Sequence, residues 1–130
     1  LIIDLLTWMH QNKADYTNTF CYLMNEKIKE NKIYNNQGFI SWKQQWQERL
    51  KLHNNSTEKS LKLMRSVNPL VIPRNHKVEK VLEAANNDDL NPLKNLLRIL
   101  EKPYENQEKI KEYRSLAPPS DKKYQTFCGT

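Results

Sequence analysis

Apolar residues recur at intervals of three and four positions along most of this 130-residue chain. This spacing places them on one face of an α-helix, because a helix completes a turn about every 3.6 residues. One such series is Phe39, Trp42, Trp46 and Leu50. Glycine, which tight turns between strands need, occurs only twice in the chain, at Gly38 and Gly129. The sequence therefore predicts an all-α fold of six to seven short helices in an irregular bundle, with an extended C-terminal tail.

Two helices are expected before residue 32. Asp15 can accept a backbone N–H at the start of the second helix, which is expected to run to about Lys29. A polar loop over residues 32–38 follows. In the first helix, Ile2, Leu5, Leu6 and Met9 are expected to form one apolar face, with Trp8 beside it. Farther along the chain, a short helix is expected to carry Leu61, Met64 and Val67 inward. The periodicity predicts a further helix marked by Val78, Val81, Leu82 and Ala85, and then a helix with a regular apolar face made of Leu93, Leu96, Leu97 and Leu100.

Two prolines interrupt the helical pattern in the middle of the chain. Pro69 and Pro73 each fix their own φ and push the preceding residue out of the helical region. The segment between them, Leu70-Val71-Ile72, is expected to be a short extended rod whose apolar side chains are covered. A new helix is expected to open with the polar residues directly after Pro73.

These polar residues are the first candidate site. Arg74, Asn75 and His76 supply a planar guanidinium, an amide and an imidazole within three positions. Such groups can hydrogen-bond a ligand phosphate or an acidic side chain of a neighbouring domain. They can equally cap the helix that begins there and pair with Glu79. The residues alone leave both readings open.

The chain is basic, with a formal net charge of +6. Its lysines are interleaved with glutamates, which favours a solvated helical surface over a patch that follows a phosphate backbone. Trp42 and Trp46 could stack on nucleobases, but they share one helical face with Phe39, which favours a place in the core. A nucleic-acid partner is therefore not favoured. A non-enzymatic basic helical module that binds protein or nucleic acid remains the alternative function.

Several kinds of chemistry are excluded within this chain. There is no glycine-rich phosphate loop, and the three histidines and two cysteines do not have the spacing of metal ligands. No catalytic residue, cofactor or metal is therefore expected here. No apolar run approaches the ~20 residues of a membrane span, so no membrane partner is expected.

The two ends of the chain suggest how it is organised. It starts at Leu1, inside a helical pattern, and is expected to be a piece of something longer. Residues 1–117 are predicted to form a helical region, and residues 118–130 a tail. Cys128 lies in this tail, where an accessible thiol can take part in redox exchange.

Five collinear stretches together resemble the C-terminal part of the SelO/YdiU family. They cover nearly the whole chain, and the combination of Asn-Pro, Pro-Arg-Asn-His and a cysteine-bearing terminus is specific. The Pro-Arg-Asn-His form and the Phe-Cys-Gly-Thr ending are similar to the Gram-positive bacterial branch. The stretches are Leu5 to Phe20, Trp42 to Leu50, Met64 to Glu79, Leu97 to Tyr104, and Pro118-Pro119 with the closing Tyr124 to Thr130.

The resemblance implies a cytoplasmic parent protein with a kinase-like fold. Members of this family transfer AMP from ATP to Ser, Thr or Tyr hydroxyls of protein substrates, with Mg²⁺ or Mn²⁺ bound. The family's residues for ATP and metal lie upstream of this part, so none is carried over to a position here. The chain is then expected to be inactive alone, with a structural or regulatory role beside the missing N-terminal catalytic region in cis.

The resemblance also bears on the candidate residues. In the family, the terminal cysteine or selenocysteine is linked to redox control and pairs with a cysteine near the catalytic core. Cys128 takes this place, whereas Cys21 belongs to a core-facing helix and is a poor partner. Arg74, Asn75 and His76 then fit a polar contact between lobes better than catalysis.

Overall fold

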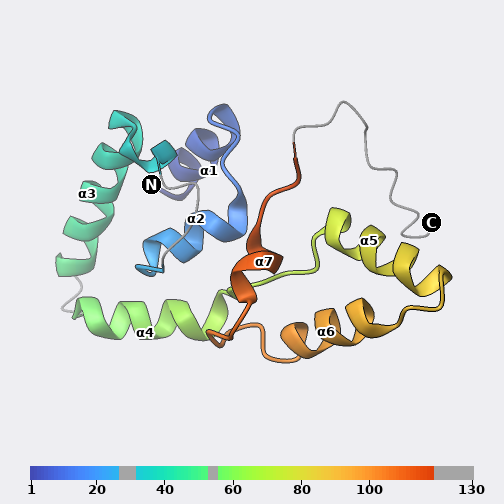
Figure 1. Ribbon diagram of the computed structural model, residues 1–130. Helices are drawn as coiled ribbons and strands as arrows, with labels where there is room; N and C mark the ends of the chain where they lie inside the picture. Colours follow the sequence, from blue (N-terminus) through green and yellow to red (C-terminus); the bar gives the residue numbers. More distant parts are fainter. Residues whose placement is uncertain (27–31, 53–55, 119–130) are drawn as a thin grey trace, which may run out of the picture. The chain divides into compact units, whose positions relative to one another are not determined.

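The computed structural model describes residues 1–26, 32–52 and 56–118 and is shown in Figure 1. Within these ranges it contains seven α-helices, one 3-10 helix and no strand, which confirms the predicted fold class. The chain separates into two compact units. Unit 1 comprises Leu1–Leu70 with Pro103–Asn106, and unit 2 comprises Val71–Lys102 with the residues from Gln107 onward. The predicted tail, apart from Pro118, lies outside the described residues, so the division after residue 117 stays a prediction.

The helices follow the apolar series and the turn signals between them. Unit 1 contains α1 Ile2–Gln11, α2 Tyr16–Leu23, the 3-10 helix η1 Lys32–Asn35, α3 Gln37–Leu52 and α4 Thr57–Val67. Unit 2 contains α5 Asn75–Asn86, α6 Asn91–Leu100 and α7 Ile110–Arg114. Pro92 lies in the first turn of α6, where its missing N–H has no helical partner to lose.

An aromatic cluster forms the core of unit 1. Phe39 is 1% exposed, and its ring centroid lies 4.7 Å from that of Trp8 and 5.0 Å from that of Tyr34. Tyr34 stacks on Tyr22 at 4.1 Å and shares a hydrogen bond with the hydroxyl of Thr19 at 3.2 Å. The expectation of a polar loop over residues 32–38 is therefore wrong at Tyr34, because these contacts bury its ring.

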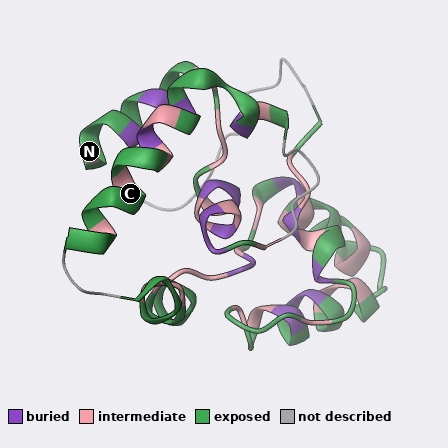
Figure 2. Ribbon diagram, turned by 90° about the vertical axis from the view of Figure 1, so that its left-hand side faces the viewer, coloured by how far each residue is buried: buried purple, intermediate pink, exposed green. Residues whose placement is uncertain are grey.

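Some helices turn a different face inward from the one expected. In α1 the side chains of Ile2 and Leu6 are 76% and 44% exposed, whereas Trp8 is 7% exposed. The rotation buries the large indole, whose Nε1 donates a hydrogen bond to Asn36 Oδ1 at 3.1 Å. Figure 2 shows buried and exposed residues together on the same helices. The same correction applies to Val67, which is expected to point inward but is 61% exposed. Leu82 and Leu97 lie in the expected helices but are 53% and 51% exposed.

The segment between the two prolines behaves as expected. Asn68 has φ −111° and ψ 115°, an extended conformation that the following proline imposes. Leu70 and Val71 are 4% and 2% exposed, so these apolar side chains are covered. Within unit 1, the N–H of Leu70 donates to the carbonyl oxygen of Pro103 at 2.7 Å.

Three helices end on a left-handed residue that is not glycine. Lys13, Asn25 and Asp88 have φ of 51°, 64° and 62°. The residue after each donates its N–H to the carbonyl five positions back, at 2.9 to 3.0 Å, in the pattern of a Schellman motif. At Asn25 this motif ends α2 at Leu23, so the expected extension to Lys29, itself outside the described residues, is wrong.

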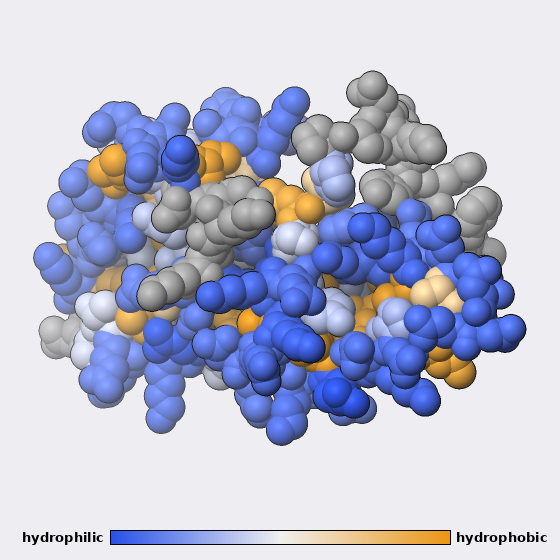
Figure 3. Space-filling view, in the orientation of Figure 1, coloured by the Kyte–Doolittle hydropathy of each residue, from blue (hydrophilic) through white to orange (hydrophobic). Residues whose placement is uncertain are grey.

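The surface is mainly polar. On the face shown in Figure 3, hydrophilic residues predominate and hydrophobic ones form separate patches. No helix in the described ranges combines the length and the apolar character that a membrane span requires.

The left-handed helix ends predict a gain of stability from glycine. We expect Lys13→Gly to raise the free energy of unfolding by about 0.5–1 kcal/mol, because glycine has no Cβ that resists a positive φ. Urea denaturation followed by tryptophan fluorescence measures this change, since all three tryptophans lie in unit 1. In the control variant Lys62→Gly, glycine falls inside α4 and should lower stability by about 1 kcal/mol. A loss of stability in both variants would contradict the interpretation.

Candidate functional site

The three polar residues after Pro73 lie at the start of α5 but do not face one way. Arg74 precedes the helix with φ −84° and ψ 130°, and its carbonyl oxygen accepts the N–H of Lys77 at 2.8 Å. Arg74 is half-buried, Asn75 is exposed and His76 is 8% exposed. The structure thus confirms that a helix opens here. It does not bring the three side chains together into one ligand-binding cluster.

The alternative that these residues cap the helix is not supported either. In the described structure, the side chain of Arg74 at the N-cap position makes no capping hydrogen bond with α5. The first turn of α5 contains no acidic residue that would interact with the positive end of the helix. The contacts at this helix start include the Arg74 carbonyl oxygen, which also accepts the N–H of Val78 at 3.0 Å, and the buried side chain of His76.

Burial and neighbouring charge both act on the imidazole of His76. Burial lowers the pKa of His76, and the positive charges of Lys77, Arg74 and Lys80 lower this pKa further. The carboxylate of Glu79 acts in the opposite direction and has the smallest effect. His76 is therefore neutral at neutral pH and suited to donating one hydrogen bond and accepting another. The surrounding cations make this end of α5 attractive to an acidic partner.

The described residues do not contain the ligand set of a metal ion. Within residues 1–26, 32–52 and 56–118, no three His, Cys, Asp or Glu side chains converge. Gly38 has a packing role in the first turn of α3. A Cβ at this position would lie 3.0 Å from Asn36 Oδ1 and 3.4 Å from Trp8 Cδ1, so glycine allows α3 to approach α1 closely.

The two cysteines fall into different parts of the chain. Cys21 is 0% exposed in α2, and its Sγ lies 3.8 Å from the carbonyl oxygen of Pro69. This confirms that Cys21 faces the core. Cys128 lies outside the described residues, so its expected redox role stays a prediction.

Two buried polar groups were not anticipated from the sequence. The guanidinium of Arg114 in α7 is 8% exposed, and its Nη2 has no hydrogen-bond partner among the described residues. Asn18 in α2 is 5% exposed, and its Oδ1 also has no hydrogen-bond partner among the described residues. No sequence signal separates Arg114 from the other charged residues of its segment, because its burial is a tertiary property.

Comparison with known proteins connects this helical structure to one family. A family model described as protein adenylyltransferase SelO matches residues 1–101. Proteins named protein nucleotidyltransferase YdiU are 52% identical in Pelagibacter ubique, 47% in Syntrophotalea carbinolica and 45% in Clostridium botulinum. Each match covers 100% of this chain and 27% of the relative. No solved structure matches the chain.

The chain thus spans 27% of the length of these curated relatives. The identities do not single out the clostridial protein, so the expected Gram-positive branch stays a prediction. The family model, however, covers most of the chain, including the rod between the two prolines and the start of α5. This chain therefore belongs to the family described as protein adenylyltransferase SelO.

Proposed function

We propose that this chain is the C-terminal helical region of a longer protein adenylyltransferase, here called the parent. The parent transfers AMP from ATP to Ser, Thr or Tyr hydroxyls of protein substrates in the cytoplasm. The observation that carries the proposal is the family match over residues 1–101. The printed name of the relatives, protein nucleotidyltransferase, supports the same reaction class.

In such a transfer, a protein hydroxyl attacks the α-phosphorus of ATP and pyrophosphate leaves. Mg²⁺ or Mn²⁺ would neutralise charge on the phosphates. We place the nucleotide and the metal in the N-terminal kinase-like region, because the family resemblance puts the residues that hold them upstream of this chain. The role proposed for this chain is structural and regulatory, and alone it is inactive.

The alternative of a nucleic-acid module has less support. Trp42 is 8% exposed, and its Nε1 donates to the carbonyl oxygen of Leu1 at 2.6 Å, so its face is not open to a base. Trp46 is half-buried and stacks on Trp42 with the ring centroids 6.0 Å apart. The two tryptophans therefore do not form a stacking platform for successive bases.

Labelled ATP tests the proposed transfer. We expect the parent to incorporate label into protein from ATP labelled at the α-phosphate and not from ATP labelled at the γ-phosphate, because AMP is the group transferred. The 130-residue chain should incorporate neither label and should show no binding of ATP and Mg²⁺ by calorimetry. Transfer of the γ-label would indicate a kinase, and micromolar binding of ATP by the chain would contradict the placement of the site.

We propose further that Arg74, Asn75 and His76 form a polar contact with the catalytic region of the parent. Asn75 is the exposed member and is suited to reach the partner surface. His76 anchors the start of α5 from the buried side, and the charge of Arg74 favours an acidic partner.

The contact predicts a difference between the parent and the chain. We expect Asn75→Ala to destabilise the parent by about 1 kcal/mol, the contribution of one hydrogen bond, and to leave the 130-residue chain nearly unchanged. Thermal unfolding of both proteins measures this difference. Asn86→Ala is the matched control, since Asn86 is exposed at the other end of the same helix. Equal effects of both substitutions in the parent would remove the support for the contact.

We propose last that Cys128 regulates the parent by forming a disulfide with a cysteine of the catalytic region. In this step two thiols lose two electrons and two protons to an oxidant such as oxidised glutathione, which becomes two reduced molecules. The burial of Cys21 supports a partner outside this chain.

A pair of variants tests this regulation. We expect the adenylyl transfer by the parent to differ between reduced and oxidised glutathione buffers, and Cys128→Ser to abolish the difference. The control Cys21→Ala should keep it, because the Cys21 thiol is buried. The measurement is the rate of label incorporation from α-labelled ATP. An unmodified parent that works equally well in both buffers would rule out the redox role.

A further inference from the structure

Two cavities in unit 1 share one wall on α3. The first has a volume of about 270 Å³ and lies among α2, α3 and α4, and the second has a volume of about 280 Å³ and lies beside η1. Lys43 and Gln47, one helical turn apart on α3, line both cavities. The two hollows therefore form one double cavity, divided by a polar ridge that carries a positive charge.

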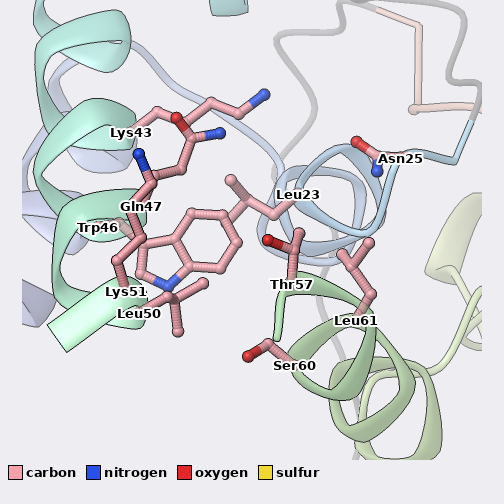
Figure 4. Close-up of a pocket in the computed structure, with 10 residues that line it drawn as sticks. All are labelled: Leu23, Asn25, Lys43, Trp46, Gln47, Leu50, Lys51, Thr57, Ser60 and Leu61. Atoms are coloured by element: carbon pink, nitrogen blue, oxygen red, sulfur yellow. The ribbon is translucent and has the colours of Figure 1, made fainter. Parts of the chain in front are cut away.

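The walls of the first cavity combine an aromatic plane with aliphatic side chains. Figure 4 shows the indole of Trp46 extending from α3 toward Thr57 and Leu61. Trp46 is held in this position by its parallel stack on the buried Trp42, with an interplanar angle of 7°. The side of the ring that faces the cavity thus presents a rigid apolar surface.

The ridge carries the positive charge of Lys43, and a neighbouring ring restrains the ammonium group of this side chain. The Nζ of Lys43 lies 5.1 Å from the centroid of the Tyr22 ring, a cation–π contact that restrains the side chain. Lys51 also lines the first cavity and adds a second positive charge there. No carboxylate belongs to the described residues that line either cavity.

The volumes of the two cavities limit the size of the group that can bind in them. Pockets for cofactors and drug-sized ligands measure roughly 300–1,000 Å³, and each of these cavities falls just below that range. Each has room for about one large side chain, and two such spaces side by side suit two side chains of one extended segment. A second copy of this chain is disfavoured as the occupant, because each copy carries a net charge of +6.

We infer that the double cavity binds a short acidic peptide segment of a partner protein. The segment places one aromatic or aliphatic side chain against Trp46 and a carboxylate against Lys43. A second apolar side chain enters the cavity beside Tyr22 and Tyr34, whose rings are already stacked. This binding is distinct from adenylyl transfer and does not require the parent to be active.

Fluorescence anisotropy with defined peptides tests the inference. The probe is a fluorescein-labelled hexapeptide with the sequence Asp-Glu-Phe-Asp-Leu-Glu, and its control is Lys-Arg-Phe-Lys-Leu-Arg, which keeps both apolar residues. We expect the 130-residue chain to bind the acidic peptide, to bind it more weakly as salt increases, and not to bind the basic one. Absence of binding at low salt, or equal binding of both peptides, would overturn the inference.

Charge-reversal variants locate the binding. Lys43→Glu and Lys51→Glu should each weaken the affinity for the acidic peptide by about fivefold to tenfold. The matched control Lys62→Glu makes the same charge change on α4, at an exposed residue that lines neither cavity, and should have little effect. Circular dichroism verifies that each variant keeps its helices. An equal loss of affinity in Lys62→Glu would show that only net charge matters and would overturn the site.

Nuclear magnetic resonance gives a readout that does not depend on substitution. The indole N–H of Trp8 and that of Trp42 are donated to Asn36 Oδ1 and to the Leu1 carbonyl oxygen. Of the three tryptophans, only Trp46 is among the described residues that line these two cavities. We expect the acidic peptide to shift the Trp46 indole resonance and to leave the other two in place. Peptide binding without this shift would place the peptide elsewhere and overturn the inference.

Two competing occupants are distinguished by further arms of the same assay. In the first, a single-stranded oligonucleotide is added as a competitor. If it binds more tightly than the peptide and displaces it, the partner is a nucleic acid and the inference of a peptide is overturned. The unmodified parent should bind the acidic peptide as the 130-residue chain does. Loss of this binding in the parent would mean that another part of the same polypeptide fills the cavity, which would overturn a partner protein as the occupant.

Discussion

The packing of Tyr34 and Phe39 in the core of unit 1 holds its helices in place. Tyr34 comes from a four-residue 3-10 helix, yet it stacks on Tyr22 from α2 and contacts Phe39 from α3. Burial raises the pKa of Tyr34, and the hydrogen bond with Thr19 acts in the opposite direction. The hydroxyl therefore stays protonated and satisfied inside the core. One residue joins two helices to a segment that has no long helical pattern of its own.

The sequence predicts the helices better than the way they end and turn. Spacing of three and four identifies α1, but this helix has apolar residues on two sides, and only the core decides that Trp8 points inward and Ile2 outward. The end of α2 at Leu23 depends on Asn25 in the left-handed region, a role usually associated with glycine. The rod at Leu70 and Val71 was predictable, because proline geometry is local and covalent.

At the candidate site after Pro73, too, the sequence predicts the residue types but not the directions of the side chains. Sequence predicts the chemical types of Arg74, Asn75 and His76, but consecutive helical residues point about 100° apart around the axis. Asn75 and His76 therefore cannot point in one direction in the first turn of α5. Arg74 precedes the helix in an extended conformation, and the structure gives the three side chains different exposures. The cavities beside α3 were not predicted, because their walls come from segments that are distant in the sequence.

The two halves of α3 have different tasks. Its N-terminal half is fixed in the aromatic core by Phe39 and Trp42, which are 1% and 8% exposed. Its C-terminal half carries Trp46, which packs against the edge of that core, and Lys51, and both line a cavity. A helix anchored at one end presents the other end rigidly, because the backbone hydrogen bonds transmit the constraint along its axis. The residues that stabilise unit 1 thereby also position the residues for which we propose contact with a partner. The stack of Trp42 on Trp46 connects the core of unit 1 to the proposed binding site.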